Sequence, residues 1–337
     1  MKTLVTGAAG FIGSAVVRRL LARGRAVRVL LEPGATPRVD LLAGLDVERA
    51  TGSVLDREAV RRAVAGCEVV HHLAAIYALW TRDPRRLYEV NVGGTTTVLA
   101  AALRASVRRV IHVSSIAAVG AAAAGELADE DSVFGAADWA QGNDYIRSKW
   151  LAERAALDLV EAGLPVVVVN PAFPFGAGDV GPTPTGRMIL EVLQRRAPGV
   201  APGGFCVADV EDMAEAAVRA EEHGRVGARY ILGSHNLDFV TFYRTLAEVA
   251  GSRRVALRVL PGPLLKAAGW LYERWADTVS LTAPPITYKG AVQVCRRLWF
   301  DTGRARAELG MPTTPLAVTL ERAVGWFRAH GYVPDGS

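Results

Sequence analysis

Cysteine and long apolar runs are both scarce in this sequence of 337 residues. The three cysteines, Cys67, Cys206 and Cys295, are odd in number and lack metal-ligand spacing, so we expect neither a disulfide framework nor a metal site. No run reaches 18 apolar residues, and we therefore expect no membrane-spanning helix. The chain opens on a strand pattern instead of a signal peptide, which favours a cytoplasmic protein.

Basic runs interleaved with aromatic residues are also missing, although the net charge is +5. The arginines occur as scattered pairs, such as Arg18-Arg19 and Arg61-Arg62. This distribution is typical of a solvated arginine-rich surface, and we expect no nucleic-acid partner. One apolar, partly amphipathic stretch at 259–275 has two interpretations. It is a helix that covers a substrate pocket, or it makes peripheral contact with a membrane surface.

Short apolar stretches alternate with longer helical patterns along the first two thirds of the chain. Near-continuous apolar strands linked by helices predict a parallel sheet covered on both faces, which is the doubly wound α/β (Rossmann-type) fold. A proline- and glycine-rich loop is predicted at 170–186. We expect a dinucleotide-binding domain over 1–175 plus about 208–235. A smaller, interleaved C-terminal substrate lobe then takes 176–207 and 236–337. The predicted strands are 3–6, 27–31, 68–72, 108–115, 164–170 and 229–233.

A glycine-rich loop, "VTGAAGFIGSA", follows the first predicted strand and opens the first helix. Gly7 suits the sharp turn, Gly10 allows a pyrophosphate to approach the backbone, and Gly13 allows the helix to pack closely. The N-terminus of the helix offers N–H groups and partial positive charge to phosphates. The loop therefore predicts a dinucleotide site.

Glu32 follows the second predicted strand, where an acid can bind the adenosine ribose hydroxyls. Its charge repels a 2′-phosphate, so NAD is favoured over NADP. Arg28 and Arg38 are near enough in sequence to keep NADP open as the alternative.

Lysine is rare, since Lys+Arg number 39 and only Lys2, Lys149, Lys266 and Lys289 are lysine. Lys149 lies four residues after Tyr145. The plain interpretation is a surface pair at i, i+4 on a helix. The alternative is a tyrosine acid–base whose pKa a neighbouring ammonium lowers.

The glycine loop, "SS" at the end of a strand and Y-x-x-x-K together resemble the extended short-chain dehydrogenase/reductase family, over nearly the whole chain. Two groups are most similar. "YALWTRDPRRLYEVNV", "GPTPTGRMI" and "RYILG" resemble the hopanoid-associated sugar epimerases, and the chain also resembles the 3β-hydroxysteroid dehydrogenase and dihydroflavonol-reductase group.

The resemblance implies a catalytic triad of Ser115, Tyr145 and Lys149. Ser115 would bind the substrate oxygen, with adjacent Ser114 as the open alternative. Bringing the pKa of Tyr145 from about 10 to about 7 requires roughly 4 kcal/mol. A cation at 5 Å supplies about 3 kcal/mol at an effective dielectric of 20. We therefore expect Lys149 and a positive nicotinamide ring to lower the pKa of Tyr145.

The resemblance also implies a set of cofactor contacts. His72 is expected to be structural, and Ser53 stands where the family has an acid for the adenine, with Asp56 three residues on. The expected cofactor-binding residues are Gly7, Ala9, Gly10, Phe11, Ile12, Gly13, Glu32, Ser53, Val54, Leu73, Ala74, Ala75, Asn91, Lys149, Pro171 and Ala172.

The substrate is suggested by "PAFPFG", in which Phe173 replaces an asparagine common in sugar-nucleotide epimerases. A phenylalanine cannot hydrogen-bond a nucleotide phosphate. An apolar pocket is the alternative, and its candidate lining residues are Tyr77, Trp80, Trp139, Phe173 and Phe175, with Ser115 at the reacting oxygen.

Three functions follow in order. The first is a reversible NAD(P)-dependent dehydrogenase/reductase for a secondary alcohol or ketone of an apolar, steroid-like or polyketide-like molecule. The second is a sugar epimerase or dehydratase, and the third is a non-catalytic nucleotide sensor. The family also implies a homodimer formed through helices at 84–106 and 145–162.

Overall fold

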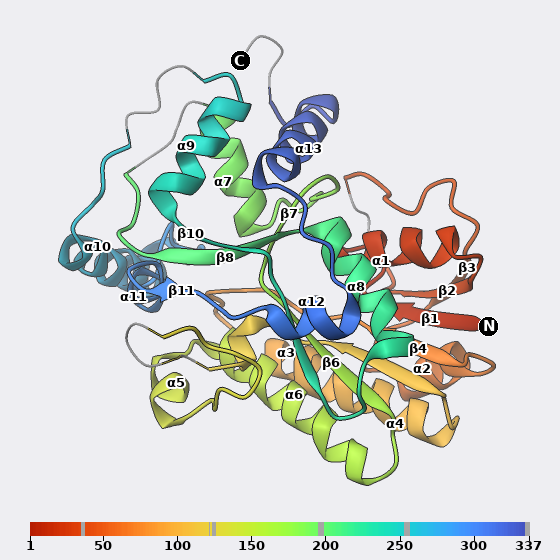
Figure 1. Ribbon diagram of the computed structural model, residues 1–337. Coiled ribbons are helices and arrows are strands. Elements are labelled where there is room, and N and C mark those ends of the chain that lie inside the picture. The colour runs from red at the N-terminus through yellow and green to blue at the C-terminus, as the bar shows by residue number, and fades with distance from the viewer. Residues whose placement is uncertain (35–37, 121, 123–125, 195–198, 253–256, 334–337) are drawn as a thin grey trace.

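The computed structural model describes residues 1–34, 38–120, 122, 126–194, 199–252 and 257–333. Two sheets organise these residues (Figure 1). The larger is parallel throughout, with strand order β3-β2-β1-β4-β5-β6-β9. Its strands are β1 (Lys2–Thr6), β2 (Ala26–Leu31), β3 (Glu48–Thr51), β4 (Val69–His72), β5 (Arg109–Val113), β6 (Val166–Pro171) and β9 (Arg229–Leu232).

Helices cover both faces of this sheet, which confirms the predicted doubly wound fold (Figure 1). One face carries α1 (Phe11–Ala22), α8 (Val210–His223) and α12 (Gly303–Leu309). The other carries α2 (Arg57–Val64), α4 (Thr95–Arg104) and α6 (Asp144–Glu161). Burial on both faces explains why the central strands read as continuous valine and isoleucine runs.

The smaller sheet has the order β10 (His235–Asp238), β8 (Gly204–Asp209), β11 (Arg297–Leu298), and β7 (Phe173–Phe175) also pairs with β8. Phe175, Phe205 and Phe242 form the centre of its core, which α7 (Pro184–Leu193), α9 (Phe239–Val249) and α13 (Leu316–Ala329) complete. The remaining helical segments are α3 (Pro84–Tyr88), η1 (Glu89–Gly94), η2 (Ile116–Ala118), α5 (Ala136–Gln141), α10 (Gly262–Trp275), η3 (Ala276–Ser280) and α11 (Tyr288–Val294).

The predicted loop at 170–186 is wrong in part. The chain stays in β6 to Pro171, enters β7 two residues later, and starts α7 at Pro184. Proline is tolerated at the start of a helix, and Thr183 caps this one by accepting a hydrogen bond from the N–H of Gly186. The predicted domain limits stay a prediction. β7, inside the predicted dinucleotide-binding domain, belongs to the smaller sheet, and α12, inside the predicted substrate lobe, packs against β9 of the larger sheet.

Candidate active site

The candidate site lies where the parallel strands of the larger sheet end. Strand order reverses at β1, which pairs with both β2 and β4. In open α/β sheets, ligands bind beyond the carboxyl ends of the strands at such a switch point. The segments that follow β1, β4 and β6 begin with Gly7, Leu73 and Ala172, all expected beside the cofactor, and the segment after β5 contains Ser115, expected beside the substrate.

The glycine loop has the backbone that its sequence predicts. Gly7 has φ of +69°, and a Cβ placed there would approach the main-chain N of Ala74 to 2.7 Å. A Cβ on Gly13 would collide with the carbonyl oxygen of Gly7. These two glycines therefore allow the turn, the loop after β4 and the start of α1 to lie in direct contact.

Gly10 is the N-cap of α1 and is exposed, with no side-chain cap and no acidic residue in the first turn. The side chain of Phe11 is buried in the core, so Phe11 can offer a ligand only its main chain. An open helix N-terminus next to a close-packed glycine turn fits the pyrophosphate of a dinucleotide. Ala9 and Ile12, which are partly buried, flank this segment.

Glu32 follows β2 directly and is exposed, as a ribose-binding acid requires. The two arginines that kept NADP open are both engaged elsewhere. Arg28 donates to the carbonyl oxygens of Ala63 and Ala65 at 2.7 Å and pairs with Glu48. Arg38 donates to the carbonyl oxygen of Gly331 at 3.0 Å and stacks on a tyrosine ring. These contacts favour NAD.

Asp56 does not take the place of the missing adenine acid. It is the N-cap of α2 and accepts hydrogen bonds from the N–H groups of Glu58 and Ala59. Partly buried Ser53 remains nearest the expected position, and the side chain of Val54 packs where Gly94 lacks a Cβ.

His72, at the end of β4, is structural. Thr95 donates to the carbonyl oxygen of Asn91, so its Oγ1 must accept from Nε2 of His72, at 2.9 Å. Nδ1 of His72 then accepts from Thr6 at 2.8 Å, which fixes one neutral tautomer. Burial lowers the pKa of His72 to about 3, so the ring stays neutral at physiological pH.

Asn91 orders the loop that follows β4. Its side-chain oxygen accepts from the N–H of Ile76 at 2.7 Å, and its amide donates to the carbonyl oxygen of Ile76 and to Ser148 Oγ, each at 3.0 Å. Ser148 in turn donates to the carbonyl oxygen of Tyr145. Asn91, carried on the π-helical turn η1, thus joins the loop of Leu73, Ala74 and Ala75 to α6.

Tyr145 and Lys149 lie one turn apart on α6, and Ser115 follows β5. The side chain of Ser115 lies near that of Tyr145 and acts to lower the pKa of the tyrosine, and its oxygen accepts a hydrogen bond from the N–H of Ala117 at 3.1 Å. Ser114 instead lies against the carboxyl group of Glu153, at 5% exposure. The structure therefore brings Ser115, and not Ser114, to the tyrosine.

The expected low pKa of Tyr145 is not found in this protein alone. Burial raises the pKa of Tyr145 to about 12, and the neighbouring Ser115 only partly opposes the rise. Burial also lowers the pKa of Lys149 to about 8, against the attraction of Glu153. Desolvation disfavours the charged form of both groups and is the largest influence on each pKa.

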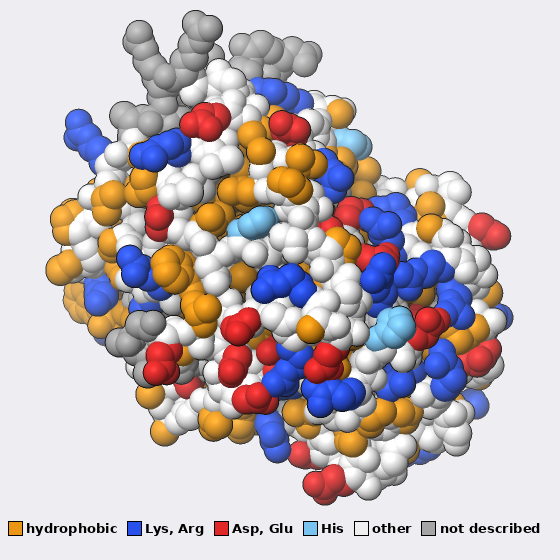
Figure 2. Space-filling model, viewed as in Figure 1, with side chains coloured by type: hydrophobic (Ala, Val, Ile, Leu, Met, Phe, Trp, Pro, Cys, Tyr) orange, Lys and Arg blue, Asp and Glu red, His pale blue; other side chains and the backbone are white. Residues whose placement is uncertain are grey.

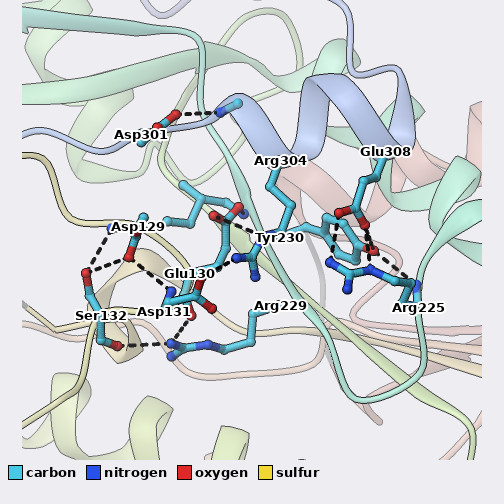
Figure 3. Close-up of polar contacts among 12 residues, drawn as sticks. Asp129, Glu130, Asp131, Ser132, Arg225, Arg229, Tyr230, Asp301, Arg304 and Glu308 are labelled. Atoms are coloured by element: carbon cyan, nitrogen blue, oxygen red, sulfur yellow. Dashed lines mark hydrogen bonds and ion pairs between the residues drawn. The ribbon is translucent and has the colours of Figure 1, made fainter.

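Glu153 and Asn170 form a buried polar pair that the sequence analysis missed. Asn170 donates to Glu153 Oε2 at 2.6 Å and to the carbonyl oxygen of Ser115 at 2.9 Å. Arg229 donates to Glu153 Oε1 at 3.3 Å and also binds the carbonyl oxygen of Ser132 (Figure 3). Glu153 lies four residues after Lys149 and therefore on the same face of α6. This spacing was the only sign in the sequence that Glu153 belongs near the site.

Aromatic rings line the substrate side only in part. The ring of Tyr77 makes an edge contact with that of Tyr145, with centroids 4.6 Å apart. Trp80 donates to Asp277 Oδ1 at 3.1 Å, so its loop reaches η3. Phe173 is partly buried at the edge of the smaller core, in edge contact with Phe205 at 5.2 Å.

One expected lining residue belongs elsewhere, since Phe175 is 2% exposed and sits in the smaller core. Trp139 packs on Trp150 and under Arg147, and its place in a substrate pocket stays a prediction. Pro171 and Ala172 are buried at the end of β6, as a wall beside a nicotinamide would be.

Comparison with known proteins shows which family the chain belongs to. Residues 3–233 match the family described as NAD dependent epimerase/dehydratase. The chain belongs to this family. NAD is its cofactor, which confirms the prediction made from the glycine loop and Glu32.

Relatives within the family carry different names. The chain is 34% identical to a Synechocystis sp. protein provisionally named dihydroflavonol 4-reductase, over 98% of this chain and 95% of that protein. It is 33% identical to sterol demethylase protein B of Methylococcus capsulatus, over 99% and 100%. A nucleoside-diphosphate-sugar epimerase from Pseudomonas aeruginosa has the same fold, with a TM-score of 0.82, 28% identity and 99% of both chains covered.

Proposed function

We propose that this protein is an NAD-dependent dehydrogenase/reductase that interconverts a secondary alcohol and a ketone on an apolar molecule. One observation carries the proposal. Tyr145 lies beside Ser115, which acts to lower its pKa, and one helical turn from buried Lys149, at the carboxyl end of the central strands. The glycine turn, the open start of α1 and Glu32 are placed to hold the NAD.

The residues divide the chemistry between them. NAD, when bound, supplies or takes up the hydride. Tyr145 is protonated at neutral pH because its pKa is about 12, so its hydroxyl is ready to give a proton to a ketone oxygen. Ser115 donates a hydrogen bond to the same oxygen as its negative charge develops. Lys149 contributes positive charge to the proton transfer and would bind the ribose hydroxyls of the cofactor.

In the direction of alcohol oxidation, Tyr145 must act as a base. Burial opposes this, and a positive ring beside the tyrosine would help to offset the opposition. The high pKa of Tyr145 in the protein alone therefore keeps its hydroxyl protonated, as ketone reduction requires, whereas alcohol oxidation needs the positive ring to lower that pKa.

An apolar substrate is supported by the residues around Tyr145. Tyr77 contacts its ring, and Phe173 stands where an asparagine would bind a nucleotide. The names of the two relatives, one a reductase and the other a sterol protein, agree with this choice.

Sugar epimerisation is the second candidate, supported by the Pseudomonas relative. An epimerase oxidises and re-reduces one carbon and must keep its NAD throughout. Denaturing freshly purified protein and quantifying the released nucleotide separates the two functions. An empty or readily exchanged site supports the dehydrogenase, whereas stoichiometric NAD contradicts it in favour of the epimerase.

A non-catalytic sensor is the weakest candidate, because the chain keeps both Tyr145 and Lys149 at the site. Homodimerisation through 84–106 and 145–162 also stays a proposal. Sedimentation at several protein concentrations would test it.

A further inference from the structure

Helix α10 presents its largest side chains to solvent. Leu264 is 59% exposed, Trp270 54%, Leu271 61% and Trp275 58%. Figure 2 shows hydrophobic side chains gathered over this helix, at the left edge of the molecule. Single exposed apolar residues are ordinary, but a contiguous group of large ones marks an interaction site.

The inner side of α10 carries small residues. Gly269 and Ala276 are buried, and a Cβ on Gly269 would lie 2.7 Å from the carbonyl oxygen of Thr287. The helix therefore packs tightly against the segment that begins α11. This arrangement is the reverse of an ordinary surface helix, in which large apolar residues face the core. The outward face is built for something other than this chain's own core.

The apolar face extends beyond the helix. Leu264, Leu271 and Trp275 follow helical spacing of seven and four residues, and Val279 continues it another four residues on. Further exposed apolar residues of the same region of the chain are Val259, Tyr272, Leu281 and Tyr288.

The polar residues in and beside α10 leave this face positive. Arg258, Lys266 and Arg274 form no ion pair with any of the residues that the structure describes. The two acids of this segment, Glu273 and Asp277, keep their negative charge, so the three cations exceed them by one. Glu273 accepts from the N–H of Tyr288 at 2.8 Å, and Asp277 accepts from Trp80 at 3.1 Å. Unpaired basic side chains beside exposed tryptophan and leucine side chains complement a partner that has an anionic surface and an apolar interior.

We propose that α10 and η3 bind the surface of an anionic lipid bilayer, with Leu264, Trp270, Leu271 and Trp275 inserted at the headgroup level. Tryptophan favours that depth, since its ring is apolar and its N–H is polar. Each cation near such a surface strengthens binding through its attraction to the anionic headgroups. A helix of this kind lies in the plane of the interface without crossing it, and no helix among the described residues is long and apolar enough to span a bilayer.

The bound face adjoins the substrate side of the active site. Asp277 on η3 accepts a hydrogen bond from Trp80. Tyr77, three residues before Trp80 in the chain, contacts the ring of Tyr145. An apolar substrate could then pass from lipid to the tyrosine with little exposure to water. This role in substrate delivery rests on the proposed function, whereas the membrane contact itself does not.

Vesicle co-sedimentation of the full chain tests the contact. Wild-type protein should bind vesicles of phosphatidylcholine that contain about 30 mol% phosphatidylglycerol, because their surface is anionic. It should bind vesicles of pure phosphatidylcholine less well. The double variant Leu271→Asp, Trp275→Asp should bind at least about 10-fold more weakly, since burying either side chain contributes about 1.5–3 kcal/mol. Val226→Asp is the matched control, because Val226 is 48% exposed on another part of the surface.

Absence of wild-type binding to either vesicle, or equal binding by the double variant, overturns the proposal. So does a dimer, seen by light scattering without lipid, that the double variant converts to a monomer. If that variant unfolds at a lower temperature than wild type, a second double variant, Lys266→Gln, Arg274→Gln, replaces it. Unchanged binding of this second variant to anionic vesicles then overturns the proposal. All these readouts are independent of turnover.

Discussion

Nζ of Lys149 donates a hydrogen bond of 3.0 Å to the carbonyl oxygen of Val113. This contact fastens α6 to the end of β5, two residues before Ser115. Lys149 is 4% exposed, and burial lowers its pKa to about 8. Few lysines lose their proton so close to neutral pH, so the charge at the candidate site depends on the surroundings of this one side chain.

Replacing Tyr145 by phenylalanine should abolish most turnover. General acid catalysis contributes about 10²–10⁴-fold, and we expect a loss in that range in kcat for ketone reduction, followed by NADH oxidation. The affinity for NAD, measured by calorimetric titration, should change little. Tyr332→Phe is the control, since the Tyr332 hydroxyl donates to the carbonyl oxygen of Val180 and has no role in the proposed chemistry. Unchanged turnover in Tyr145→Phe would remove the catalytic assignment.

The two adjacent serines should respond differently to alanine substitution. Ser115→Ala removes the hydroxyl that lies beside Tyr145, and kcat should fall about 10²-fold, as for other oxyanion donors. Ser114→Ala removes a hydroxyl that lies against Glu153, and kcat should stay within a few-fold of wild type. A larger loss in Ser114→Ala would reverse the assignment of the two serines.

Replacing Glu153 by glutamine should move the alkaline limit of activity. A lysine is charged below its pKa, so activity that needs charged Lys149 is present at low pH and lost as pH rises through about 8. The Glu153 carboxylate raises the pKa of Lys149. Its removal should therefore start the loss of kcat/KM at lower pH and reduce turnover at pH 8 several-fold.

A control on the same helix isolates this charge effect. Glu161 ends α6 and is exposed, so Glu161→Gln should leave the pH profile where it is. A uniform fall of kcat/KM in Glu153→Gln, without movement along the pH axis, would mean that Glu153 only supports the fold.

Glu32 should set the preference for NAD over NADP. Glu32→Gln removes the charge that repels a 2′-phosphate, and the ratio of the two dissociation constants should move towards NADP by about 10-fold, which is about 1.4 kcal/mol. Asp46→Asn, at another exposed acid, should leave the ratio unchanged. Equal ratios in wild type and Glu32→Gln would show that another residue discriminates the cofactors.

The sequence alone determined the features that depend on neighbouring residues. Gly7, Gly10 and Gly13 occupy a single strand–turn–helix, and the φ of Gly7 and the crowding at Gly13 are local requirements of that turn. Tyr145 and Lys149 share one helix face because they lie four residues apart. Alternation of apolar strands and helices was likewise enough to predict the parallel sheet.

Only the tertiary structure decided what depends on packing between distant segments. Asn170 and Glu153 are 17 residues apart, and Arg229 is 76 residues from Glu153, so no local pattern joins them. The pKa of Tyr145 rises because the folded chain removes water from it, which spacing along a helix does not report. The outward turn of Leu271 and Trp275 was settled in the same way, by the close approach of Gly269 to Thr287.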